Sequence, residues 1–130
     1  MGLNIVYEED ENMKYTFICY PQWGTCQKAK KWLEANKVEY EYRHIAEQNP
    51  TAKELQEWIP QSGLPIKKFF NSSGKIYREM GLKDKIPQMT DEEIIELLST
   101  DGMLVKRPLL IGDNKVLVGF NAAVWESIRE

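Results

Sequence analysis

The sequence is poor in the residues that build metal centres and disulfide frameworks. Its 130 residues include one histidine and two cysteines. Two cysteines are too few for a secreted disulfide scaffold, and one histidine does not supply a metal ligand set. No metal is therefore predicted. A reactive thiol in such a chain would be catalytic or sensory, which suits a reducing compartment.

Long apolar runs and a strong charge excess are also missing. No run approaches the roughly 20 apolar residues that span a bilayer, and residues 8–11 are acidic where a signal peptide would be basic. A cytoplasmic location without membrane association is expected. The net charge of −3 gives no overall nucleic-acid footprint, so direct DNA binding is not expected. Local basic groups remain at Lys28, Lys30, Lys31, Lys67 and Lys68.

The length suits one domain with its own core. Residues 1–12 end in a polar run before Met13. We expect this segment to be an extension that is disordered or was added during cloning. Residues 13–130 are then a single domain.

One stretch near the beginning of that domain organises the rest. Residues 15–20 are bulky on both faces, which is typical of a strand covered on two sides. A turn with Pro21 and Gly24 follows, and residues 25–37 have helical spacing of apolar side chains. Cys26 falls in the first turn of this helix. Unpaired N–H groups and the helix dipole would stabilise its thiolate there and raise its reactivity.

The remaining segments predict a mixed α/β fold. Residues 38–45 alternate as a second strand, completing a βαβ unit. A helical block from about 50 to 102 contains two capping boxes, which begin at Thr51 and Thr90. Strand-like runs at 104–111 and 115–120 flank a Gly-Asp-Asn turn, and Asn121 can cap a last helix. The order is β-α-β, helical insert, β-β-α, which is the thioredoxin-like arrangement.

Four short motifs in this order resemble the arsenate reductase (ArsC)/Spx family. They are residues 20–34, Gly81-Leu82, residues 106–109 and residues 118–120. The resemblance extends over residues 13–130. It implies a thioredoxin fold with a helical insertion, in a family of glutaredoxin-linked arsenate reductases, glutathione-dependent thiol reductases and the redox-sensing regulator Spx.

The chain departs from the Cys-x-x-Cys motif that many of these relatives carry. Aligning the motif places Trp23 at the first cysteine position and Cys26 at the second. Without a thiol at Trp23, Cys26 is not expected to complete an intramolecular dithiol cycle. A mixed disulfide of Cys26 with glutathione or with another protein remains open.

The resemblance also implies an oxyanion site made by three arginines. One corresponds to Arg107, whereas the other two positions fall near Ser73 and Phe120, which offer no guanidinium group. Arg78 could substitute for Ser73. Arsenate reduction itself is therefore not expected. By resemblance, the Arg107–Pro108 bond is predicted to be cis.

Structural roles are the alternatives for several of these residues. Cys26 could be a partly buried helix residue, and Cys19 is expected to be a core residue. A disulfide between them is conceivable but not expected in a reducing compartment. Trp23 could be a lid over its neighbours or a partner contact, and His44 is expected to be structural.

The leading hypothesis is an ArsC/Spx-family thiol-redox protein. Cys26 is its candidate catalytic thiol, and Arg107 contacts an anion such as a glutathione carboxylate. Substrate-facing positions are Trp23, Gly24, Thr25 and Pro108. Glutathione is a candidate co-substrate, with no bound cofactor, and glutaredoxin or thioredoxin are candidate partners. The alternatives are a non-enzymatic, Spx-like regulator that binds RNA polymerase, and a pseudoenzyme.

Overall fold

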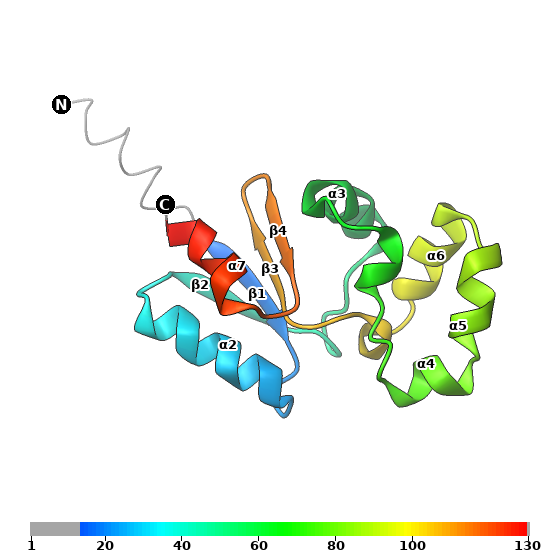
Figure 1. Cartoon of the computed structure of the whole chain (residues 1–130), viewed down its shortest axis with the longest axis horizontal. Coiled ribbons are helices and arrows are strands. Elements are labelled where there is room, and N and C mark those ends of the chain that lie inside the picture. Colours follow the sequence, from blue (N-terminus) through cyan, green and yellow to red (C-terminus); the bar gives the residue numbers. More distant parts are fainter. Residues whose placement is uncertain (1–13, 130) are drawn as a thin grey trace.

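The computed structural model describes residues 14–129, so the extension expected at residues 1–12 lies outside the described residues. A four-stranded sheet with the order β2-β1-β3-β4 forms one half of the molecule (Figure 1). Its strands are β1 (Tyr15–Cys19), β2 (Tyr40–His44), β3 (Leu109–Gly112) and β4 (Lys115–Val118). Strands β1 and β2 are parallel, whereas β3 is antiparallel to both β1 and β4.

Helices α2 (Gly24–Ala35) and α7 (Ala122–Trp125) pack against the sheet. The buried residues of α2 are Cys26, Ala29 and Leu33, which recur at helical spacing. They pack with Phe17 and Cys19 of β1 in one hydrophobic cluster. Alternate residues of a strand point to opposite faces, so these two β1 residues mark the face that α2 covers.

The helical segment between β2 and β3 forms the other half of the molecule (Figure 1). Its α-helices are α3 (Ala52–Ser62), α4 (Lys75–Glu79), α5 (Leu82–Lys85) and α6 (Asp91–Leu98). Short 3₁₀ turns lie between them at Ile66–Phe69, Ile86–Gln88 and Gly102–Leu104. The predicted capping boxes at Thr51 and Thr90 are both present, and they fix where α3 and α6 begin.

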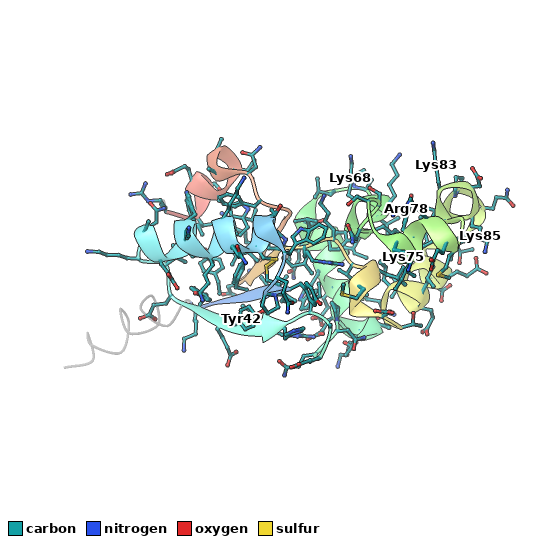
Figure 2. All side chains as sticks on the ribbon, turned by 90° about the horizontal axis from the view of Figure 1, so that it is seen from below. Tyr42, Lys68, Lys75, Arg78, Lys83 and Lys85 are labelled. Atoms are coloured by element: carbon teal, nitrogen blue, oxygen red, sulfur yellow. A yellow bond between two sulfur atoms is a disulfide. The ribbon has the colours of Figure 1, made fainter. Side chains whose placement is uncertain are left out.

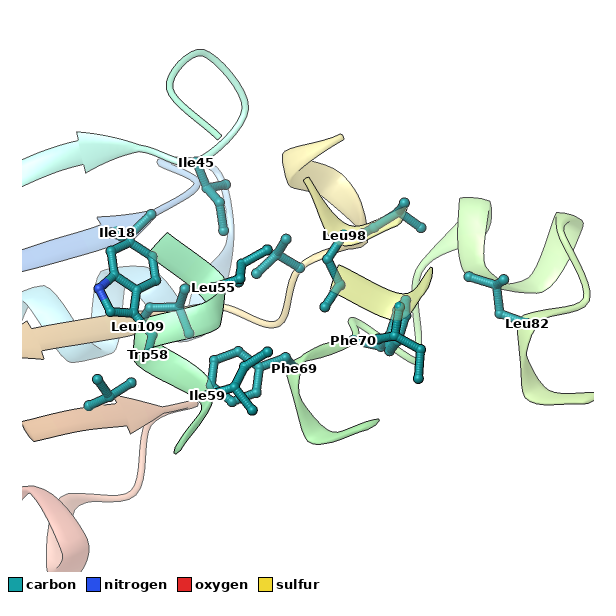
Figure 3. Close-up of a cluster of buried hydrophobic side chains, with 14 residues drawn as sticks. Ile18, Ile45, Leu55, Trp58, Ile59, Phe69, Phe70, Leu82, Leu98 and Leu109 are labelled. Atoms are coloured by element: carbon teal, nitrogen blue, oxygen red, sulfur yellow. The ribbon is translucent and has the colours of Figure 1, made fainter. Parts of the chain in front are cut away.

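A continuous hydrophobic core joins the sheet to the helical segment (Figure 3). Ile18 and Leu109 lie on the sheet face opposite to Phe17, and they belong to the same cluster as Trp58 of α3 and Leu98 of α6. The helical segment is therefore packed against the sheet through apolar contacts, which stabilise the position of its loops near the site.

One strand boundary differs from the sequence prediction. A strand was expected from residue 104, but Gly102–Leu104 is a 3₁₀ turn and β3 begins only at Leu109. Val105 forms an isolated bridge with Phe70 of the helical segment instead. Pro108 then prevents regular strand pairing before Leu109, because proline lacks the N–H group that a sheet ladder needs. Within residues 14–129, the helices are all too short or too polar to cross a membrane.

Candidate functional site

The candidate site forms where β1 ends and α2 begins. The Trp23 N–H donates to the Tyr20 carbonyl at 2.9 Å, closing the turn after β1. Helix α2 then begins at Gly24, which places Cys26 in its first turn as the sequence predicted. This short turn brings the first turn of α2 back beside Cys19, the last residue of β1.

Cys26 is joined to Cys19 by a disulfide bond, with a Cα–Cα distance of 5.8 Å. Cys19 is fully buried, and Cys26 is 3% exposed. The Tyr20 N–H donates to the Sγ of Cys26 at 3.3 Å. The pair connects the last residue of β1 to the first turn of α2.

This pairing overturns the expectation that Cys19 and Cys26 are not joined by a disulfide. Cys26 is not a free thiol in this structure, and Cys19 is not only a core residue. The sequence argument looked for a partner three residues before Cys26 and found Trp23. The strand instead provides the partner, because Cys19 lies on the sheet face that α2 covers.

Arg107 is the second element of the site. The Arg107–Pro108 peptide bond is cis, which is the geometry that the resemblance implied. The Arg107 side chain is only 3% exposed. Its Nη2 donates to the Met103 carbonyl at 2.7 Å and its Nε donates to the Val105 carbonyl at 3.3 Å. Its Nη1 is buried and has no hydrogen-bond partner among the described residues.

Two aromatic rings flank the guanidinium. Its central carbon lies 5.0 Å from the centre of the Trp23 ring and 5.9 Å from that of Tyr20. Burial lowers the pKa of Arg107, while Tyr20 and Asp101 act in the opposite direction. An arginine remains protonated despite such a shift. The site therefore holds a buried positive charge beneath Trp23.

A cavity of about 440 Å³ opens beside Arg107. Its lining comes from four parts of the chain: Trp23, Thr25, Asn71, Ser73, Lys106, Arg107, Val118, Gly119, Phe120 and Asn121. Ser73, Arg107 and Phe120 are the positions at which the resemblance implied arginines, and all three line it. We call this cavity the Arg107 pocket.

The structure brings together only some of the predicted site residues. Trp23, Thr25 and Arg107 line the Arg107 pocket, whereas Gly24, Pro108 and Cys26 are not among its lining residues. Sequence reasoning did not name Asn71, Lys106 or Asn121 as site residues, although Lys106 is part of the motif at residues 106–109. Their only signal was their closeness in the sequence to positions that the resemblance named.

Arg78 does not replace the arginine that is missing near Ser73. It is exposed, it is not among the residues lining the Arg107 pocket, and its Nη1 donates to the Ser73 backbone carbonyl at 2.7 Å. It belongs instead to a group of basic residues on the helical segment (Figure 2). The labelled members of that group are Lys68, Lys75, Arg78, Lys83 and Lys85.

His44 has a structural role at the end of β2. Its Nδ1 accepts hydrogen bonds from the N–H groups of Ala46 and Glu47, at 3.1 and 3.3 Å. In residues 14–129, histidine, cysteine and acidic side chains form no group of three or more that could hold a metal ion.

A second cavity, of about 370 Å³, touches the disulfide itself. Both cysteines line it, together with Phe17, Pro21, Gln27, Lys30 and Tyr42. We call it the disulfide pocket. The two cavities share no lining residue: both cysteines line the disulfide pocket, and Arg107 lines the other.

Comparisons with known proteins agree with this architecture. The ArsC family model matches residues 19–128. The protein YusI of Bacillus subtilis is 52% identical over 88% of this chain and 97% of its own length, and the regulatory protein MgsR of the same organism is 31% identical over 82% of each. The crystal structure of an ArsC family related protein from Bacteroides fragilis is 56% identical, with a TM-score of 0.88 over 89% of this chain and 98% of that one. The chain belongs to the ArsC family and has its thioredoxin-like fold.

Proposed function

We propose that this protein is a thiol-redox protein that cycles between the Cys19–Cys26 disulfide and the corresponding dithiol. The observation that carries the proposal is the disulfide at the start of α2. Reduction of this bond to the dithiol takes up two electrons and two protons from an external thiol, and oxidation returns them. Both sulfur atoms belong to this chain, so a thiol at Trp23 is not required.

The position of Cys26 favours this chemistry. In the dithiol form, its sulfur lies in the first turn of α2 beside the Tyr20 N–H group, which donates to it at 3.3 Å in the disulfide form. Helix N-termini and N–H donors stabilise a thiolate. Cys19 is buried in the strand and lacks a helix terminus, so Cys26 is the better thiolate of the two.

Arg107 supplies the anion contact in this proposal. Its Nη1 has no protein partner, and a buried donor without an acceptor costs about 1–3 kcal/mol. An anionic group of the substrate in the Arg107 pocket would remove that cost. Ser73 and Phe120 offer no guanidinium, so the pocket lacks the three arginines that arsenate reduction implies.

Thiol trapping combined with mass spectrometry tests the redox cycle. The protein would be equilibrated in buffers of different glutathione ratio and quenched with acid. It would then be labelled with a maleimide after denaturation, because Cys19 is fully buried in the folded chain, and its modified cysteines would be counted. The expected result is one transition in which both cysteines become labelled together. Independent labelling of Cys26, with Cys19 unlabelled throughout, would refute the proposal. In Cys19→Ala, Cys26 should instead form a persistent mixed disulfide with glutathione.

A second candidate function is that of a non-enzymatic, Spx-like regulator. The similarity to MgsR, a protein named as regulatory, favours it, as does the tryptophan at the usual attacking position. The partner in this case would be RNA polymerase. Affinity purification with purified RNA polymerase discriminates the two: a regulator retains the polymerase, and a thiol reductase consumes glutathione without retaining it.

A further inference from the structure

The disulfide and the Arg107 guanidinium face different cavities. Cys19 and Cys26 both line the disulfide pocket, and neither lines the Arg107 pocket. Trp23, Thr25 and Arg107 line the Arg107 pocket instead. A thiol that reacts with the disulfide must touch a sulfur atom, so its route is through the disulfide pocket.

We infer that the disulfide pocket is a binding site for a small anionic thiol, which reduces the Cys19–Cys26 bond from this side. The inference rests on the proposed redox cycle. It adds the site at which the co-substrate, a low-molecular-weight thiol that carries a carboxylate, reaches the disulfide.

The size and walls of the pocket fit such a molecule. A volume of about 370 Å³ lies in the range of small-ligand sites, which is roughly 300–1,000 Å³. Phe17 and Pro21 supply apolar surface. The Gln27 side-chain amide donates to the Pro21 carbonyl at 3.2 Å, which links α2 to the turn beneath it.

Tyr42 of β2 also lines the pocket, and Figure 2 labels it on that strand. Its hydroxyl donates to the Cys19 carbonyl at 3.3 Å. Burial raises the pKa of Tyr42, and the charge of Glu47 raises it further. The hydroxyl therefore stays protonated and adds no negative charge to the pocket.

Lys30 is the one residue with a full charge among the seven that line the pocket. It is exposed on α2, and the described residues offer it no salt bridge. A positive charge at the opening attracts an anionic thiol and raises its local concentration beside the sulfur atoms. A thiol without a carboxylate carries only the charge of its reacting thiolate, so it gains less from the same charge.

The exchange has two balanced steps. The thiolate of the reductant attacks the Sγ of Cys26, which is 3% exposed, whereas Cys19 is fully buried. A bond forms between the reductant and Cys26, the Cys19–Cys26 bond breaks, and Cys19 leaves as a thiolate that takes a proton from water. A second thiolate then attacks the reductant's sulfur in the mixed disulfide. Cys26 leaves at the helix N-terminus, and two thiol molecules have become one disulfide.

Reduction kinetics of charge variants test the site. Oxidised protein would be mixed with glutathione or with 2-mercaptoethanol, quenched with a maleimide, and the remaining disulfide measured by mass spectrometry. Lys30→Gln should slow reduction by glutathione roughly two- to fivefold, the effect of losing one exposed charge interaction. Its rate with 2-mercaptoethanol, whose reacting thiolate has no carboxylate, should fall by a clearly smaller factor. Lys28→Gln is the matched control, since Lys28 is exposed on the same helix and does not line the pocket.

Lys106→Gln tests the competing route, because Lys106 lines the Arg107 pocket. If Lys106→Gln slows the glutathione reaction and Lys30→Gln does not, or if Lys30→Gln and Lys28→Gln behave alike, the inference is wrong while the redox cycle stands. If the wild-type chain forms no reducible disulfide, the proposed function itself fails.

Discussion

Reduction of the Cys19–Cys26 bond should lower the stability of the fold by a calculable amount. The bond joins residues separated by 7 positions, so it closes a loop of eight residues, 19–26. In the chain-entropy treatment, a loop of eight residues corresponds to about 2.5 kcal/mol at 25 °C. For a domain of this size the corresponding change in melting temperature is about 10 °C.

Urea denaturation of the oxidised and the reduced protein measures this difference directly. The free energy of unfolding should fall by about 2.5 kcal/mol on reduction. The slope of that free energy against urea concentration should rise, because the reduced unfolded chain is less compact and exposes more surface. Cys26→Ala is the control, since reductant should leave the stability of a chain without the bond unchanged.

Two results would contradict this reasoning. One is a difference below about 0.5 kcal/mol between oxidised and reduced protein, which is within the usual error of comparing variants. The other is an equal effect of the reductant on Cys26→Ala. Either would show that the bond does not constrain the unfolded chain as its loop length requires.

Three further predictions concern the scaffold, and urea denaturation checks each. The Arg43 hydrogen bonds lower the pKa of Glu54. A carboxyl group whose pKa is lower in the folded than in the unfolded chain stabilises the fold above its unfolded-state pKa, and this stabilisation is lost as the pH falls through its folded-state pKa. Glu54→Gln should therefore lower the free energy of unfolding at pH 7, and this difference from wild type should shrink below about pH 4.3. Gly102→Ala should destabilise by at least about 3 kcal/mol, because the new Cβ would overlap the Ile45 carbonyl. Thr90→Ala removes the N-cap of α6 and should cost about 1 kcal/mol.

The fold could be predicted from the sequence because its signals are local. The capping boxes at Thr51 and Thr90 mark helix starts within four residues. The strand that was expected from residue 104 was placed too early, since apolar residues occur on both sides of Arg107-Pro108. Val105 is buried in the core shared with the helical segment, and its backbone pairs with that of Phe70, a contact that no local pattern encodes.

The site was harder to predict because its parts are distant in the sequence. Asn71, Lys106 and Asn121 meet only after the helical segment has packed against the sheet. The partner of Cys26 did have a local signal. Phe17 and Cys19 alternate with Ile18, so the parity of the strand places Cys19 on the face that α2 covers.

In the proposed function, Trp23 accounts for the separation of thiol chemistry from anion binding. It is the residue that the resemblance aligned with the first cysteine of the Cys-x-x-Cys motif, and its ring lies 5.0 Å from the guanidinium of Arg107. One side chain thus removes a thiol from the Arg107 pocket and covers the charge there. Cys26 keeps a partner because Cys19 approaches from the strand, on the other side of the turn. Tyr20 contacts both parts, through its N–H group on the Cys26 sulfur and its ring near Arg107.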